Sequence, residues 1–319
     1  MKRLDNIYSQ ICSTENLQLA DKNAQKGKQK QPGVISHNKV SEQNILLLQK
    51  MLVGRTYKTS KYVTFKVFEP KERDVYRLPY FPDRIAQYAA LNIIEQVFVS
   101  VFTADTYSCI KGKGIHGAVR KLKKYLKDTE GTKYCLKLDI KKFYPSVDHD
   151  ILKQLLRRKF KDQGLLWLLD EIIDSAPGLP IGNYMSQYLA NFYLCYFDHW
   201  IKEVKGVKYY FRYADDIVLL APDKASLHYL LTEITEYLLV NLKLEVKSNY
   251  QVFPVQQRGI DFLGYVFYHT HTRLRKTIKK NFARKAAKGA NQATIASYNG
   301  WAKHANCKHL LKKILNETV

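Results

Sequence analysis

The most constraining feature of this sequence is the placement of three carboxylates at the ends of apolar segments. Residues 134–140 alternate apolar and polar side chains, as expected of a half-buried strand that ends near Asp139. Residues 208–221 contain two apolar segments separated by Asp215 and Asp216, which is typical of a β-hairpin with an acidic tip. The pattern predicts an antiparallel sheet that carries acidic side chains where its strands end.

These carboxylates are candidate metal ligands. Two adjacent acids at a hairpin tip repel each other unless a cation neutralises them. An isolated Asp-Asp pair is more often simply a turn. Together with Asp139, however, the arrangement suits a divalent metal, and hard carboxylate oxygens favour Mg²⁺.

The charge of the whole chain points to an acidic partner. Of 319 residues, 52 are Lys or Arg and 29 are Asp or Glu, which gives a formal net charge of +23. With 46% hydrophobic residues the chain is globular rather than a disordered basic tail, so we expect a polyanionic partner, most simply nucleic acid. The length allows roughly two domains.

Location is predicted from what the sequence does not contain. It has no apolar run long enough for a membrane span, and its N-terminus lacks the apolar core of a signal peptide. The five cysteines are odd in number and form no C-x-x-C pair. We therefore expect no membrane association, no disulfide framework and a cytoplasmic location.

The positive charge is concentrated in two stretches. Residues 270–319 hold twelve Lys or Arg and one acid, Glu317, for a net +11, and residues 111–127 form a second basic run. A single run of this kind is usually a solvated face. Two runs without balancing acids favour a phosphate-binding surface.

Coarse periodicity places the other elements. A helix is expected over residues 41–53, a strand over 62–68, and a helix from about residue 83 to 98. Further helices are expected over 149–160, 188–201 and 227–238, whereas the polar stretch 21–31 is expected to be a loop or an exposed basic arm. The order predicts an α+β fold in which helices cover one face of an antiparallel sheet.

Six ordered stretches along nearly the whole chain resemble the motifs of reverse transcriptases. They are Tyr213–Asp216 (YADD), Asp139 within LDIKKFYPSVDH, Arg73 within PKERDVYRLPYFPDR, Ser108–Leu122 (SCIKGKGIHGAVRKL), Leu242–Ser248 (LKLEVKS) and Gly259–Gly264 (GIDFLG). The resemblance implies an RNA-directed DNA polymerase with the right-hand architecture: an antiparallel palm sheet backed by helices, and a helical thumb. It assigns residues 1–130 to an N-terminal extension and fingers, 131–268 to the palm with some interleaving of fingers and palm, and 269–319 to the thumb.

The same resemblance implies roles for individual residues. Asp139, Asp215 and Asp216 would form the catalytic metal site for two Mg²⁺ ions, with Asp216 contributing mainly field and hydrogen bonding. Lys247 resembles the lysine thought to protonate pyrophosphate, although it could equally contact phosphate or lie in solvent. Arg73 resembles the arginine that holds the incoming triphosphate.

Other residues are assigned to the nucleotide and to the duplex. Tyr144 occupies the position of an aromatic gate that selects deoxynucleotides, with core packing as the alternative. Lys71 and Arg77 could share the work of Arg73. Arg284, Lys285 and Lys288 fall on one side of a predicted thumb helix and would contact the nucleic-acid backbone.

One motif resembles a narrower group. Pro180–Gln187 (PIGNYMSQ) stands where most reverse transcriptases have Q-G-x-x-x-S-P, and Ile181 before Gly182 is the pattern of the enzymes of diversity-generating retroelements. Both residues would lie at the incoming nucleotide. Because isoleucine cannot form the hydrogen bond that glutamine forms, we expect low fidelity, with template adenine the weak point. The alternative is that Ile181 only shapes a loop.

The resemblance also implies partners. They are a structured template RNA, a DNA primer and its cDNA product, dNTPs, and a small helical accessory protein that forms a pentamer. The product would be mutagenised cDNA that diversifies a target gene. A retron-like or group II intron-like enzyme of ordinary fidelity is the first alternative, and an RNA-binding polymerase fold without activity is the second.

Overall fold

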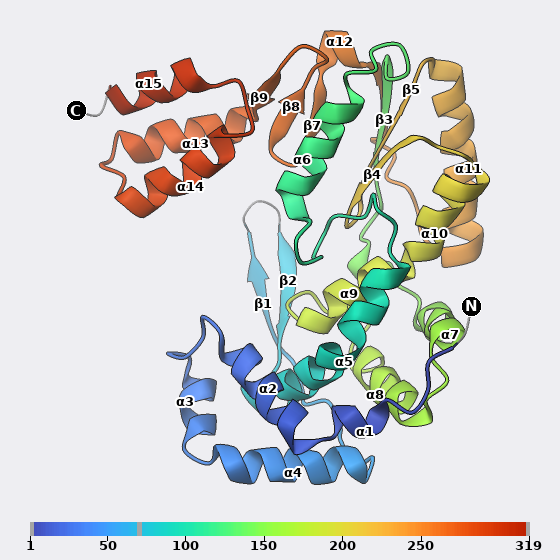
Figure 1. The fold of residues 1–319 in the computed structure, drawn as a ribbon, viewed down its shortest axis with the longest axis vertical. Helices are drawn as coiled ribbons and strands as arrows, with labels where there is room; N and C mark the ends of the chain where they lie inside the picture. The colour runs from blue at the N-terminus through green and yellow to red at the C-terminus, as the bar shows by residue number, and fades with distance from the viewer. Residues whose placement is uncertain (1–2, 69–71, 317–319) are drawn as a thin grey trace. The chain divides into compact units, whose positions relative to one another are not determined.

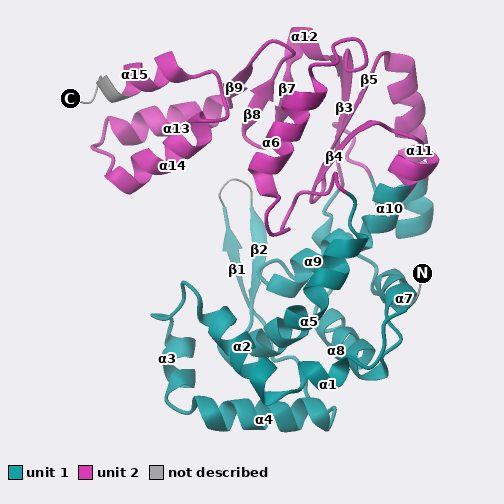
Figure 2. Cartoon of the chain, viewed as in Figure 1, with its two compact units in different colours: residues 1–103, 141–199, 237–245 teal, residues 104–140, 200–236, 246–319 magenta. Residues whose placement is uncertain are grey.

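The computed structural model describes residues 3–68 and 72–316, and it divides the chain into two compact units. Unit 1 comprises residues 1–103, 141–199 and 237–245, and unit 2 comprises residues 104–140, 200–236 and 246–319 (Figure 2). Each unit is therefore assembled from three separate stretches of chain. The three-domain division expected from the sequence stays a prediction.

Unit 1 is mainly helical. Its elements are α1 (Tyr8–Ile11), α2 (Thr14–Gln25), α3 (Pro32–Asn38), α4 (Ser41–Val53), β1 (Val63–Val67), β2 (Arg73–Arg77), a π-helical turn (Tyr80–Arg84), α5 (Ile85–Val101), a 3₁₀ turn (Tyr144–Ser146), α7 (His149–Lys159), α8 (Gln163–Ile173), α9 (Tyr184–Tyr193) and α10 (Cys195–His199). The buried helix α5 packs against α2 and α9 (Figure 1).

Unit 2 holds the four-stranded and the three-stranded sheet. Its elements are α6 (Gly114–Tyr125), β3 (Tyr134–Asp139), a π-helical segment (Trp200–Val204), β4 (Tyr209–Tyr213), β5 (Asp216–Ala221), β6 (Gln251–Pro254), α12 (Val255–Arg258), β7 (Ile260–Phe262), β8 (Tyr265–Phe267), β9 (Thr272–Leu274), α13 (Lys276–Ala286), α14 (Gln292–Ala302) and α15 (Lys308–Asn316). Helix α11 (Lys224–Leu242) begins in unit 2 and ends in unit 1.

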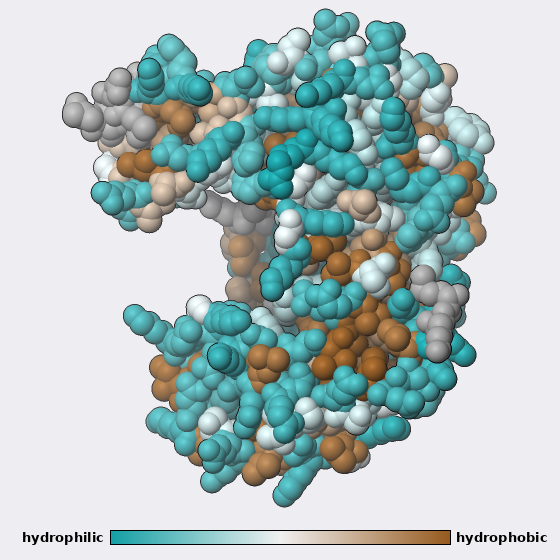
Figure 3. Space-filling view, viewed as in Figure 1, coloured by the Kyte–Doolittle hydropathy of each residue, from teal (hydrophilic) through white to brown (hydrophobic). Residues whose placement is uncertain are grey.

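The larger sheet of unit 2 has the strand order β4-β5-β3-β6, and all of its pairs are antiparallel. On one of its faces, Cys135, Phe211 and Val218 pack against Val119 and Leu122 of α6 in one hydrophobic core. Leu136 on the opposite face of β3 is also fully buried. The expected half-buried strand is therefore covered on both faces. Hydrophilic side chains cover the outer surface of α6 and most of the visible face of unit 2 (Figure 3).

Several expected elements are present with shifted ends. The helix over 41–53 is confirmed as α4, and that over 149–160 as α7. The expected helix 188–201 starts earlier, at Tyr184, and is interrupted after Tyr193. Strand β1 is exposed along its whole length, because it pairs only with β2 in a two-stranded sheet.

The expectation for residues 21–31 is wrong in its first half, because α2 continues to Gln25. Its polar residues are compatible with a helix, since Leu17, Ala20 and Ala24 of the same helix are buried in unit 1. Asp21 also forms an ion pair with His37, at 3.2 Å, and accepts a hydrogen bond from Tyr80 Oη. Tertiary packing thus holds a segment that has little helical pattern of its own.

No helix in the described part of the chain is long and apolar enough to cross a membrane.

Candidate active site

The three predicted carboxylates come together at one end of the larger sheet. Asp139, the last residue of β3, lies directly opposite Asp216, the first residue of β5. Tyr213 pairs with Asp216 across the hairpin, so the turn contains only Ala214 and Asp215. Ala214 has a φ of 54°, in the left-handed region. The tight turn holds Asp215 beside the two strand-end acids.

Burial and mutual repulsion perturb this cluster. The pKa of Asp215 is raised to about 7, first by burial and then by the negative charge of Asp139, with a smaller contribution from Asp216. Oδ1 of Asp139 is buried and has no hydrogen-bond partner among the described residues. Both observations indicate that the positive charge nearby is too small to neutralise these carboxyl groups.

Lys247 supplies part of that charge. Its ammonium group forms an ion pair with Oδ2 of Asp139, and its backbone N–H donates to the Asp139 carbonyl at 2.9 Å. An isolated antiparallel bridge between Ile140 and Val246 fixes the two segments next to each other. The side chain of Lys247 therefore lies at the Asp139 carboxylate, and the proton-donor role that the resemblance implies stays a prediction.

The residues fit a divalent metal by donor chemistry. Among the described residues, no group of three or more His, Cys, Asp or Glu side chains is arranged to hold a metal ion, and Lys247 occupies Oδ2 of Asp139. The unpartnered Oδ1 of Asp139 and the carboxyl of Asp215 are nevertheless hard oxygen donors in a site lacking positive charge. A cation could bind there once Lys247 releases its partner.

Arg212 is a supporting residue that the sequence analysis missed. Its side chain is completely buried, and Nη1 donates to the carbonyl of Ala214 at 3.1 Å, inside the acidic turn. Its backbone carbonyl accepts a hydrogen bond from the Tyr107 N–H, at 3.1 Å. The available signal was one charged residue within the aromatic strand Tyr209–Tyr213.

The residues expected to contact the nucleotide lie in unit 1. The carbonyl of Ile181 accepts a hydrogen bond of 2.7 Å from the Tyr76 N–H in β2, the strand that begins with Arg73. Gly182 follows with a φ of 117°, and a Cβ atom there would lie 2.5 Å from the Tyr76 carbonyl oxygen. The structure thus holds Ile181 and Gly182 against β2.

Tyr144 opens the 3₁₀ turn in the same unit. Its carbonyl accepts a hydrogen bond from the Leu179 N–H, at 2.8 Å, which ties it to the segment that leads to Ile181. Phe143 is buried and contacts the Tyr144 ring edge to face, with centroids 5.6 Å apart. Phe143 is therefore the buried member of this aromatic pair.

The predicted thumb residues lie at the end of α13. Arg284 and Lys285 are in its last turn, and Lys288 follows it. Nζ of Lys285 lies 5.8 Å from the centre of the Tyr298 ring on α14. Lys71, which could have shared the role of Arg73, lies outside the described residues.

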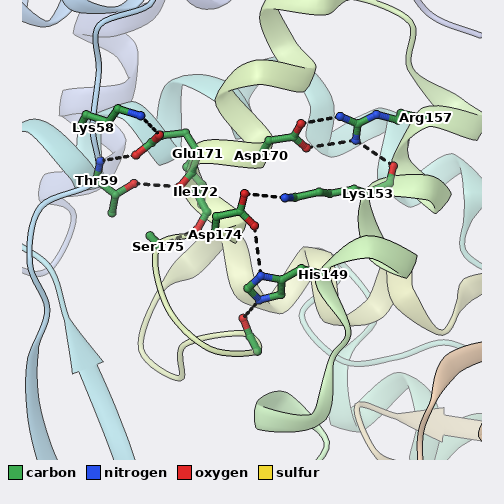
Figure 4. A network of polar contacts seen from close by, with 11 residues as sticks. Lys58, Thr59, His149, Lys153, Arg157, Asp170, Glu171, Ile172, Asp174 and Ser175 are labelled. Carbon is green, nitrogen blue, oxygen red and sulfur yellow. Dashed lines mark hydrogen bonds and ion pairs between the residues drawn. The ribbon is translucent and has the colours of Figure 1, made fainter.

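A second polar cluster, on α7 and α8 of unit 1, has a different character. Arg157 pairs with Asp170, Lys153 pairs with Asp174, and Lys58 pairs with Glu171 (Figure 4). His149 bridges Asp174 and the Gly178 carbonyl. These ion pairs join α7, α8 and the segment before β1 within unit 1.

Comparison with known proteins identifies a family match and related chains. Residues 69–267 match the profile of the family described as reverse transcriptase (RNA-dependent DNA polymerase), a range that contains every predicted site residue except the thumb cations. Protein YkfC from Escherichia coli (strain K12) is 25% identical over 285 residues, which cover 73% of this chain and 75% of the relative.

Two further comparisons cover smaller shares of the matched proteins. The group II intron-encoded protein LtrA from Lactococcus lactis subsp. cremoris is 25% identical over 139 residues, covering 40% of this chain and 23% of the relative. Apo telomerase from Candida tropicalis superposes with a TM-score of 0.53 at 11% identity, covering 82% of this chain and 57% of the telomerase chain. The telomerase likeness shows the fold alone, and it confirms the predicted α+β right-hand polymerase.

Proposed function

Because this chain belongs to the reverse transcriptase family, we propose that it copies a structured template RNA into DNA with Asp139, Asp215 and Asp216 as its catalytic carboxylates. Family membership confirms the predicted enzyme class, an RNA-directed DNA polymerase, and implies template RNA, a primer and dNTPs as partners. The observation that carries the proposal is the register of β3 and β5, which sets Asp139 opposite Asp216 beside the buried Asp215.

Reverse transcriptases generally use divalent metal ions, chiefly Mg²⁺. In this chain Asp139 and Asp215 would hold two such ions, and Asp216 would contribute field and hydrogen bonding. When bound, the ions would activate the primer 3′-hydroxyl and stabilise the leaving pyrophosphate. Lys247 lies close enough to the carboxylates to donate a proton to that leaving group.

The nucleotide and the duplex would be bound by other residues. Arg73 would hold the triphosphate through its planar guanidinium, and the Tyr144 ring would exclude a ribose 2′-hydroxyl. Arg284, Lys285 and Lys288 would contact the backbone of the template-primer duplex, in contacts that tolerate any sequence and weaken with salt.

The proposed finer role is mutagenic copying for the diversification of a target gene. It is supported by Ile181, whose backbone is fixed by Tyr76 and whose apolar side chain cannot test a base pair by hydrogen bonding. An apolar contact discriminates by only about 1–3 kcal/mol. Errors should therefore concentrate at template adenine. The small pentameric helical protein implied by the resemblance would assist the enzyme on its own RNA.

The alternative is a reverse transcriptase of ordinary fidelity, similar to those of group II introns or retrons. The similarity to LtrA, whose name describes it as intron-encoded, favours this alternative. A third candidate is an RNA-binding polymerase fold without activity, against which the complete set of three acids argues.

Primer extension with Mg²⁺ on a defined RNA template, followed by sequencing of the product, tests the proposal. We expect errors at template adenine about tenfold or more above those at other bases. Ile181→Gln should remove this excess, whereas Ile181→Leu, which keeps an apolar side chain of the same size, should preserve it. An even, low error rate would favour the group II-like alternative, and absence of extension would favour the inactive fold.

A further inference from the structure

A small pocket of unit 1 lies where α5, α9 and the loop after α2 meet. Its volume is about 170 Å³, and it is lined by Lys28, Leu78, Arg84, Gln87, Tyr88, Gly182, Asn183, Tyr184 and Gln187. None of its lining residues has been given a role above except Gly182. Figure 1 shows α5 and α9, which supply four of the nine lining residues, packed side by side.

The pocket contains two cations and no acid. Lys28 and Arg84 line it, no carboxylate does, and neither cation is ion-paired within the described part of the chain. Asp83, next to Arg84 in sequence, is fully buried and accepts hydrogen bonds from Tyr57 Oη and the Ser60 N–H. Burial, and then the charge of Arg84, lower the pKa of Lys28.

A buried donor in the pocket also lacks an acceptor. The side chain of Gln87 is only 3% exposed, and its Nε2 group has no hydrogen-bond partner among the described residues. A buried amide that lacks an acceptor loses the hydrogen bonds that it would make in water, which destabilises the empty pocket. Such a group in a lined pocket indicates a ligand with an acceptor atom.

The N-terminus of α9 faces the same pocket. Asn183 is the N-cap residue, but its side chain makes no capping hydrogen bond, because Nδ2 donates to Tyr62 Oη at 2.9 Å. The first backbone N–H groups of this ten-residue helix are therefore not satisfied by a side-chain cap, and the helix dipole favours an anion there. The two cations, the buried amide and the helix N-terminus therefore all favour binding of an anionic hydrogen-bond acceptor in this pocket.

We propose that Lys28, Arg84, the Gln87 amide and the N-terminus of α9 bind a phosphate group of the RNA template strand. The inference rests on the proposed function, which places Ile181, the neighbour of Gly182, at the nascent base pair. Sites that enclose a whole nucleotide-sized ligand have volumes of about 300–1,000 Å³. A volume near 170 Å³ accommodates one backbone phosphate rather than a complete dNTP.

The test measures RNA affinity without catalysis. The full chain is titrated with a short fluorescein-labelled single-stranded RNA in EDTA, at several salt concentrations. Lys28→Gln and Arg84→Gln should each weaken binding about tenfold. Each should also reduce the slope of log affinity against log salt by about 0.7, the value for one lost phosphate contact. Lys30→Gln removes the same charge from an exposed neighbour outside the pocket and is the matched control.

The outcomes separate the two possible sources of phosphate. If both pocket variants bind RNA as tightly as Lys30→Gln does, the proposal is wrong. If RNA affinity is unchanged but the KM for dNTP rises in primer extension, the pocket takes the nucleotide triphosphate, which overturns the template assignment. If the pocket variants lose RNA affinity but the wild-type chain extends no primer, the phosphate site is supported and the proposed polymerase function is contradicted.

Discussion

Lys247 is joined to Asp139 twice, by an ion pair between the side chains and by a backbone hydrogen bond of 2.9 Å. The two residues are 108 positions apart, yet the second contact fixes the lysine backbone directly beside the strand-end acid. The main-chain contact thus holds the backbone of Lys247 beside Asp139, and the ion pair holds its ammonium group on the carboxylate.

We expect Lys247→Ala to lower kcat for nucleotide addition by about a hundredfold or more, because a positioned proton donor typically contributes that much. Pre-steady-state extension with saturating dNTP measures the effect. Lys243→Ala is the matched control, since it also removes a lysine that forms an ion pair with an aspartate, Asp148. Equal losses in the two variants would show that Lys247 acts only through charge or stability.

Replacing Asp215 should separate catalysis from folding. Asp215→Asn is expected to reduce primer extension by about a thousandfold or more, because a metal-binding carboxylate is worth several kcal/mol in the transition state. Glu236→Gln, at an exposed position of α11, should leave extension unchanged.

The same substitution, Asp215→Asn, should not lower the stability of the folded chain. Because the pKa of Asp215 is raised to about 7, the folded chain binds an extra proton below that pH, and stability is lost as the pH rises through 7. In EDTA at about pH 8, Asp215→Asn should therefore melt no lower than the wild type. A clear drop in its melting temperature would contradict the electrostatic description of the site.

The turn at Gly182 should tolerate no side chain. At a φ of 117°, a Cβ atom would lie 2.5 Å from the Tyr76 carbonyl oxygen, so Gly182→Ala must strain the backbone and displace β2. We expect a loss of about 2–3 kcal/mol in unfolding free energy, measured by urea denaturation. Gly27→Ala, also at positive φ but with no atom within 4 Å, should cost only about 1 kcal/mol.

The two basic stretches of the sequence meet in unit 2 at a stacked histidine pair. The rings of His116 on α6 and His304 after α14 have centroids 4.3 Å apart. Burial, and then the charges of His116, Lys123, Arg120 and Lys303, lower the pKa of His304. Protonating His304 is therefore harder in the folded chain than in the unfolded chain.

Stability should fall as the pH drops below about 6.5, where the unfolded chain takes up the proton first. Thermal unfolding between about pH 8 and about pH 5.5 measures this, and His304→Asn should reduce the dependence. His309→Asn, an exposed histidine on α15, is the control. If the pH dependence of stability is unchanged in His304→Asn, the titration of His304 is not its cause.

Much of the candidate active site was predictable because its signals are local. Alternating apolar residues define β3, and the two adjacent acids indicated a hairpin tip, where Asp215 lies in the turn and Asp216 begins β5. The positions of Asp139, Asp215 and Lys247 follow from those patterns and from the family motifs. The polar stretch 21–31 was misjudged because its helix is stabilised by distant residues of α5 and by Tyr80, which no local pattern records.

The sequence by itself determined the charge, the strands β1, β3, β4 and β5, the acidic turn and the resemblance to the polymerase family, since these follow from the residues and their local patterns. Only the tertiary structure decided that Arg212 is buried against the turn, that Lys247 pairs with Asp139, and that Gln87 is buried without a partner. The physical reason is that burial and pairing depend on which distant segments pack together. The same polar side chain can be solvated, structural or functional until those segments meet.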